Sequence, residues 1–194
     1  MNTIITEKTP NGDVTYDVFS KLVSDRVLFI CDYIDDRAAT DIVAALLYLD
    51  GTDPETKISL YINSEGGDVR SVFMIYDIMC LISAPIETIC LGSATFEPAI
   101  LLAAGTAGMR SCTKSSLLCI SQLSSEGAQY VDMTDAKISF EQLKKDNHRI
   151  IDVLSLLTGK KKAIVMKDCE RKLYLTPLQA KRYGLIDHVL DWKK

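Results

Sequence analysis

Apolar residues recur along the chain in two alternating patterns, short continuous runs and longer stretches with helical spacing. The runs at residues 27–31, 57–63 and 86–92 are rich in aliphatic and β-branched side chains and predict buried strands. Between them, residues 35–50 and 68–82 carry apolar side chains three or four positions apart, which predicts amphipathic helices. Because strands that alternate with helices pair through crossovers, this pattern indicates an α/β fold with a mostly parallel sheet.

The pattern continues on both sides of this central part. After it, we expect a helix at residues 98–104 with Pro98 in its first turn, short strands at 109–112 and 116–120, and a long helix at 135–158.

Before it, residues 1–15 are polar and contain a turn signal at 10–13, so we expect a flexible N-terminal arm. A short helix is predicted within residues 14–23, and residues 16–194 are expected to form a single domain.

Composition narrows the class of protein. The 194 residues are 47% hydrophobic and 25% charged, a balance that excludes a disordered chain. The net charge of −4 gives no electrostatic footprint for nucleic acid. No apolar run approaches the roughly 20 residues of a membrane span, and the N-terminus lacks the layout of a secretion signal. We therefore expect no nucleic acid, no membrane and no secretion.

The cysteines show no CxxC pair and no neighbouring histidine cluster, so we expect reduced thiols, no metal and no cofactor. Four of the six lie inside apolar stretches, where a free cysteine behaves as a small hydrophobe. The six are Cys31, Cys80, Cys90, Cys112, Cys119 and Cys169.

Two loops follow predicted strands, at the sheet edge where ligands gather in parallel folds. Gly66 and Gly67 let backbone amides approach a ligand closely, as in an oxyanion hole, although a tight turn capped by Asp68 explains them as well. Ser93 and Thr95 lie where a strand leads into a helix, as at a nucleophile elbow. The layout therefore suggests a serine hydrolase.

Serine chemistry also needs a base, which is usually a histidine. His148 falls among charged residues of the long helix, and His188 falls in a final strand near the C-terminus. Both positions favour surface or capping roles, so the residues do not supply the chemistry that the layout suggests.

Three separated motifs resemble ClpP, the proteolytic subunit of the Clp protease. The sequence Tyr-Ile-Asn-Ser-Glu-Gly-Gly is similar to the family's Y-I-N-S-P-G-G turn, and the other two match its nucleophile segment and its C-terminal segment. The motifs stand at residues 61–67, 88–105 and 175–187. The resemblance covers about residues 16–190 and implies a ClpP/crotonase-like head of repeated β-β-α units with a protruding strand-helix handle near 121–158.

At the positions that match the family's catalytic motifs, the triad residues are replaced. The nucleophilic serine falls on Phe96, the histidine on Ser121 and the aspartate on Lys172. Phe96 has no nucleophilic atom, and the Ser121 hydroxyl is no base near neutral pH. The resemblance is therefore closest to the inactive ClpR-type subunits.

The resemblance also places the oxyanion-hole positions on Gly66, Gly67 and Glu97. Glu97 replaces a methionine and puts negative charge where an oxyanion would develop, which opposes catalysis. Two further replacements are Glu65, at the proline of the glycine turn, and Ser125-Glu126, at the glycine pair of the family's groove-lining strand.

Three alternatives remain open from the sequence. In the first, Ser93 or Thr95 is a displaced nucleophile. In the second, Ser121 and Lys172 form a Ser-Lys pair. In the third, the chain is a crotonase-like binding protein. A binding module with no Clp role would be a monomer or dimer.

The ClpR-like interpretation instead implies heptameric or mixed rings with active ClpP, docked to an AAA+ unfoldase, with residues 1–15 as the axial arm. Tyr61 keeps one aromatic of the family's docking pocket, and Ser59 replaces another. Such chains occur in the plastid stroma and in the bacterial cytoplasm.

Overall fold

Parallel strands form the centre of the head in the computed structural model, which describes residues 4–9, 12–124 and 132–191. The long strand β5 pairs with β6 along its first half and with β7 along its last three residues. β8 pairs with β7 in the antiparallel direction. Across the sheet the order is β3 (Val27–Cys31), β4 (Ile58–Ser64), β5 (Ile86–Thr95), β6 (Arg110–Thr113) and β9 (His188–Leu190), with β7 (Leu117–Ile120) and β8 (Leu173–Leu175) beside β5.

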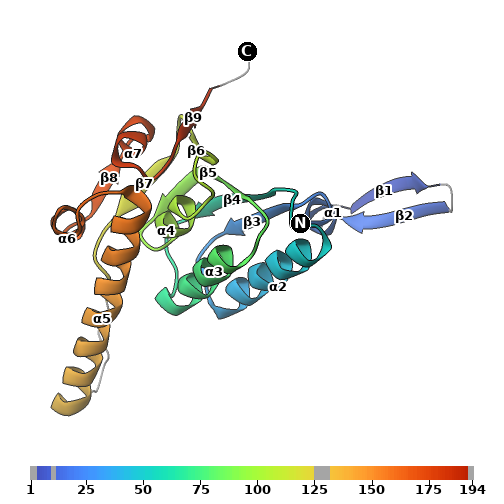
Figure 1. The fold of residues 1–194 in the computed structure, drawn as a ribbon. Coiled ribbons are helices and arrows are strands. Elements are labelled where there is room, and N and C mark those ends of the chain that lie inside the picture. The colour runs from blue at the N-terminus through green and yellow to red at the C-terminus, as the bar shows by residue number, and fades with distance from the viewer. Residues whose placement is uncertain (1–3, 10–11, 125–131, 192–194) are drawn as a thin grey trace.

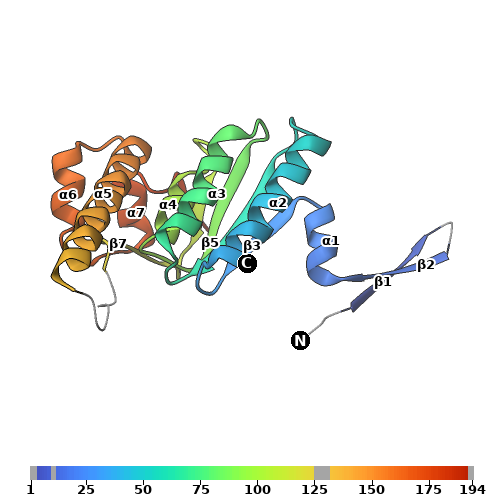
Figure 2. The same ribbon diagram turned by 90° about the horizontal axis from the view of Figure 1, so that it is seen from below.

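Three helices lie side by side over one face of this sheet (Figures 1 and 2). They are α2 (Asp36–Thr52), α3 (Val69–Leu81) and α4 (Pro98–Ala103). Local sequence determines where they begin: the side chain of Asp35 accepts from the Ala38 N–H at 2.8 Å, and Asp68 accepts from the N–H groups of Arg70 and Ser71 at 3.0 Å. Pro98 occupies the first turn of α4.

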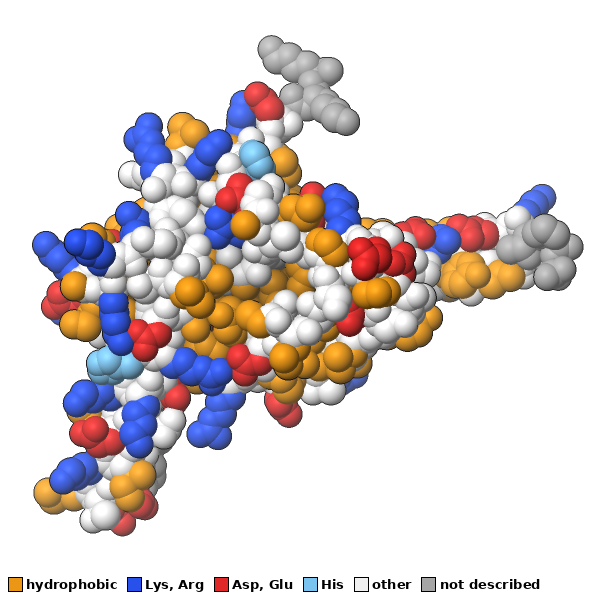
Figure 3. Space-filling model, viewed as in Figure 1, with side chains coloured by type: hydrophobic (Ala, Val, Ile, Leu, Met, Phe, Trp, Pro, Cys, Tyr) orange, Lys and Arg blue, Asp and Glu red, His pale blue; other side chains and the backbone are white. Residues whose placement is uncertain are grey.

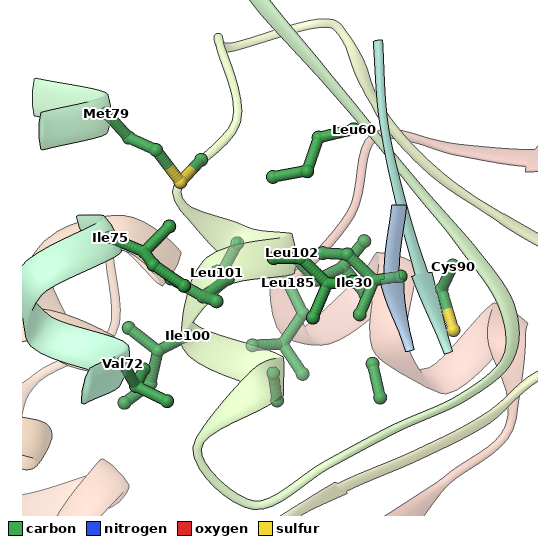
Figure 4. Packing of buried hydrophobic residues seen from close by; sticks show 14 of the residues in the cluster. Ile30, Leu60, Val72, Ile75, Met79, Cys90, Ile100, Leu101, Leu102 and Leu185 are labelled. Carbon is green, nitrogen blue, oxygen red and sulfur yellow. The ribbon is translucent and has the colours of Figure 1, made fainter. Parts of the chain in front are cut away.

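The core lies between these helices and the sheet. Figure 4 shows Val72, Ile75 and Met79 of α3 facing residues of α4, with Ile30 and Leu60 of the sheet beside them. Aliphatic side chains dominate the cluster, and many of its leucines and isoleucines, such as Ile34, Leu60 and Leu185, have no solvent exposure. This burial, at roughly 25 cal/mol per Å² of apolar surface, is the main stabilising contribution to the head.

The C-terminal third contains the handle. Helix α5 (Met133–Thr158) projects from the head in Figure 1 and ends at Gly159, which adopts the left-handed conformation with φ 69°. Two shorter helices follow, α6 (Lys162–Cys169) and α7 (Pro177–Tyr183). Ser125-Glu126 and the strand expected around them lie outside the described residues.

The N-terminal segment folds as an antiparallel hairpin of β1 (Ile4–Thr9) and β2 (Gly12–Asp17), followed by α1 (Val18–Ser24). It projects from the side of the head opposite α5 (Figure 1). The short helix expected within residues 14–23 begins later than the sequence pattern suggests, because β2 continues to Asp17 and α1 starts at Val18. The cause is the cap: Asp17 accepts from the N–H groups of Phe19 and Ser20.

The surface differs between the head and the handle. Figure 3 shows hydrophobic side chains gathered in the middle of the face that carries α2 and α3, whereas charged side chains of both signs cover α5. Tyr48 and Leu81 are 67% and 76% exposed on α2 and α3. Within the described part of the chain, no helix is long and apolar enough to cross a lipid bilayer.

Most predicted elements are confirmed, including the α/β class, the parallel sheet and the long handle helix. Strand β5 is longer than the prediction and continues through Gly92, whose φ of 87° is accessible to glycine at little cost. Helix α2 extends through Gly51 to Thr52. Helix α6 and strand β8 are absent from the prediction.

Candidate active-site cleft

The three positions that the family resemblance assigns to a catalytic triad line one cleft of about 570 Å³. Phe96 follows β5, Ser121 follows β7 and Lys172 precedes β8. These three strands are neighbours, so their ends meet at one edge of the sheet. Gly66, Gly67 and Glu97 line the same cleft. The fold therefore gathers residues that lie more than 100 positions apart in the sequence.

Phe96 sits on a sharp strand-to-helix turn. Its φ is +63°, a left-handed conformation that a bulky residue rarely adopts. The Phe96 N–H donates to the Cys119 carbonyl at 2.8 Å, which continues the β5–β7 pairing to the turn. Lys172 Nζ lies 5.1 Å from the centroid of the Phe96 ring, a cation–π contact. The turn keeps the geometry of a nucleophile elbow, and its side chain is a hydrocarbon.

Ser121 and Lys172 share the cleft, but the serine hydroxyl is engaged elsewhere. Ser121 Oγ donates to the main-chain carbonyl of Gln122 at 2.9 Å. Among the described residues, no hydrogen bond joins Ser121 to Lys172, whose side chain is exposed beside Phe96. The arrangement lacks the nucleophile–base hydrogen bond by which a Ser-Lys pair is recognised.

The glycine turn after β4 is held from one side by Ile34. The Ile34 N–H donates to the Gly66 carbonyl at 3.1 Å, and the Asp68 N–H donates to the Ile34 carbonyl at 2.9 Å. A Cβ at Gly67 would lie 2.7 Å from Ile34 Cβ, so the close approach requires glycine. Asp68 also caps the N-terminus of α3, so the same turn holds the glycine pair and starts the helix.

Glu97 lies beside the glycine turn in space. Its Oε2 lies 3.8 Å from where a Cβ of Gly66 would stand. Burial raises the pKa of the Glu97 carboxyl, and the nearby Asp68 raises it further. Hydrogen bonds from its own backbone N–H and from that of Gly67 act in the opposite direction. The carboxyl group therefore lies beside the two amides that the family resemblance expects at an oxyanion hole.

The alternative hydroxyls and both histidines lie away from this cleft. Ser93 and Thr95 are buried within β5, at 8% and 4% exposure. The Ser93 N–H donates to Asn63 Oδ1 at 3.1 Å, and the residue lines an adjoining polar pocket rather than the cleft itself. His148 Nδ1 contacts the Lys144 carbonyl at 2.6 Å on the exposed face of α5.

His188 Nε2 lies 3.2 Å from the Gly108 carbonyl. Neither histidine is among the residues that line the cleft.

The two positions expected at an unfoldase-docking pocket lie side by side on β4. Tyr61 stacks on Phe29, with ring centroids 5.2 Å apart. Ser59 Oγ donates to Glu87 Oε2 at 2.8 Å, and Lys57 Nζ donates to the same oxygen at 2.7 Å. An aromatic surface therefore adjoins a charged cluster. At the position where an aromatic residue is expected, Ser59 instead forms a hydrogen bond to Glu87.

The cysteines are free thiols. Burial raises the pKa of Cys90 to about 11 and that of Cys112 to about 12, so both stay protonated near neutral pH. Among the described residues, no group of histidine, cysteine and acidic side chains has the arrangement of a metal site.

An elbow after β5, a glycine turn after β4 and a projecting helix in an α/β head define the class of ClpP-type serine protease folds. The family model for Clp protease matches residues 10–193, and the chain belongs to this family. It is also 40% identical to the ATP-dependent Clp protease proteolytic subunit 2 of Frankia casuarinae over 190 residues. The match covers 98% of this chain and 87% of that protein. The family assignment decides against the crotonase-like alternative.

Proposed function

We propose that this chain is a non-catalytic, ClpR-like subunit of an ATP-dependent Clp protease. The observation that carries the proposal is Phe96 on the sharp turn after β5, the position that the family resemblance assigns to the serine nucleophile. A benzyl side chain forms no acyl-enzyme. Because loss of the nucleophile alone removes almost all triad-dependent rate, the remaining residues of the cleft cannot compensate.

The two other triad positions support the same conclusion. Ser121 supplies no group that accepts a proton near neutral pH, and its hydroxyl bonds to the backbone. Lys172 is a cation where a carboxylate would orient a histidine, and it contacts the Phe96 ring. The cleft therefore contains a cation–π contact between the Lys172 ammonium group and the Phe96 ring in place of a nucleophile, a base and an acid.

The proposed role is structural or regulatory within a ring. The described residues contain the α/β head and the long handle helix α5, which supports a role in ring assembly. Met133, Ile138 and Phe140 on α5 are 91%, 63% and 63% exposed, which suits a helix that packs against another ring. The exposed apolar side chains of α2 and α3 suit a neighbouring subunit (Figure 3). We propose heptameric or mixed rings with active ClpP subunits.

The surface around Tyr61 and Ser59 supports docking of an AAA+ unfoldase, with a preference for docking loops that differs from that of a surface with two aromatic residues. Tyr61 and Phe29 retain a stacked aromatic surface. The cluster of Ser59, Lys57 and Glu87 adds fixed charge beside it, which favours a docking loop that carries a complementary polar residue. Since the compared relative is bacterial, we place the assembly in a bacterial cytoplasm.

Co-expression tests the assembly directly. The chain is tagged, co-expressed with an active proteolytic subunit from the same host, purified through the tag and weighed by native mass spectrometry. The proposal predicts seven-membered rings, and double rings that contain both chains. A monomer or dimer under conditions where the active subunit forms rings would contradict it and favour a binding module outside the Clp system.

A further inference from the structure

The turn after β4 presents one backbone amide to the cleft. Ile34 pairs with Gly67 as a parallel bridge, in which Ile34 bonds to the Gly66 carbonyl and the Asp68 N–H. In parallel pairing, the residue between those two bonds directs its own N–H to the opposite side. The Gly67 N–H therefore points away from Ile34 and toward the cleft.

The turn after β5 presents a second amide. The Phe96 N–H completes the ladder to Cys119, and the Glu97 carbonyl accepts from the Ile100 N–H at 3.0 Å in the first turn of α4. Since Phe96 has a left-handed φ, the chain direction changes there, and the Glu97 N–H leaves the ladder. Within the described residues, neither this N–H nor that of Gly67 donates to a backbone carbonyl.

The side chain of Glu97 folds back onto these two amides. Its Oε2 lies 3.8 Å from where a Cβ of Gly66 would stand, and Gly66, Gly67 and Glu97 line the same cleft. The N–H groups of Glu97 and Gly67 both act to lower the pKa of the Glu97 carboxyl, as expected of amides directed at it. Two convergent backbone N–H groups favour an anion. In this chain the anion is the side chain of Glu97, whose own backbone N–H is one of the two amides.

We infer that the Glu97 carboxylate is the resident ligand of this amide pair and closes the position that a substrate carbonyl oxygen would occupy. The inference deepens the proposed function and rests on it for the identity of the amide pair as an oxyanion site. It adds a second, independent block: even with a nucleophile in place of Phe96, the acyl oxygen would have to displace a tethered carboxylate. Glu97 is thus an autoinhibitory contact within the cleft.

Hydrogen exchange of the purified, assembled chain, resolved to single amides by fragmentation mass spectrometry, tests the contact. In Glu97→Ala, the Gly67 amide loses its acceptor, and we expect its exchange to accelerate about tenfold. Glu97→Asp keeps the charge but is one methylene shorter, so it should show the same acceleration. Glu97→Gln keeps an oxygen acceptor at full length and should retain most of the protection.

Glu65→Ala is the matched control, because Glu65 lines the same cleft but is not among the groups that shift the Glu97 pKa. It should leave the Gly67 amide unchanged. Amides of β4 residues 58–62 report on global opening, and the inference requires that they exchange at the wild-type rate in Glu97→Asp. Equal Gly67 exchange in the wild type, Glu97→Ala and Glu97→Asp would overturn the inference. This readout needs no peptidase activity, so its failure is distinguishable from failure of the proposed function.

Discussion

The Arg110 side chain on β6 contacts α4, α5 and the segment between α7 and β9. Its Nε and Nη2 form a two-pronged contact with Asp187 at 2.9 and 2.7 Å. Its Nη1 donates to the carbonyls of Ala103, Leu157 and Gly184 at 3.1–3.2 Å. The side chains of Arg110 and Asp187 are 12% and 21% exposed. We predict that Arg110→Met is among the most destabilising single changes outside the apolar core.

The magnitude follows from the geometry. Hydrogen bonds from Arg110 lower the pKa of Asp187 to about 2, against the opposing effect of burial. A depression of that size corresponds to roughly 2–3 kcal/mol at neutral pH. Removing one partner of a buried pair costs about 3–5 kcal/mol. Since Asp187 keeps some exposure and still accepts from two backbone N–H groups, we expect about 2–3 kcal/mol for Arg110→Met.

Urea unfolding at a fixed protein concentration measures this cost. Lys162→Ala is the control, because the Lys162–Asp152 pair is about half exposed on both sides and should contribute less than about 1 kcal/mol. A depressed carboxyl pKa stabilises the fold above the unfolded value, 3.8, and this contribution is lost as pH falls toward 2. The difference between Arg110→Met and wild type should therefore shrink below pH 4. Equal losses for Arg110→Met and Lys162→Ala at pH 7 would refute the reasoning.

Three further predictions concern the cleft. Gly67→Ala places a Cβ 2.7 Å from Ile34 Cβ and should cost about 1–3 kcal/mol in urea unfolding; an unchanged midpoint would show that the turn yields freely. Because the pKa of Glu97 is raised in the folded chain, the folded chain holds a proton more tightly than the unfolded chain between pH 4.5 and that raised value, so stability should fall as pH rises through this window. Glu97→Gln should flatten that slope, and an identical slope would contradict the assignment. Phe96→Ser alone should show no hydrolysis of a fluorogenic peptide, because Ser121 is no base; turnover would reveal an unrecognised base in the cleft.

The elements from β3 to α4 were predictable because their apolar periodicity is strong and each is bounded by glycine, proline or a capping aspartate. Helix α6 and strand β8 are only eight and three residues long, and charged residues separate them, so no periodicity marks them. The hairpin at the N-terminus alternates weakly and buries none of the described β2 residues, which leaves no pattern for a sequence argument to detect.

Part of the candidate site was also predictable from the sequence, and part of it was not. The family motifs locate Phe96, Ser121 and Lys172, and the structure places all three at one cleft. The contact of the Glu97 carboxylate with the Gly67 amide was not predictable, because it joins two loops 30 positions apart and depends on a side-chain rotamer. Sequence indicates only that a negative charge lies nearby. The direction in which the Glu97 carboxylate points depends on the tertiary structure.

The most direct test of the central claim is peptidase turnover by rings of this chain alone. The purified chain is assayed with a short fluorogenic peptide while native mass spectrometry of the same sample records its assembly, and an active ClpP runs in parallel. The account predicts assembled rings with turnover no faster than buffer. Turnover by assembled rings, carried by this chain and abolished by Ser121→Ala or Lys172→Ala, would contradict it and identify a serine–lysine peptidase instead.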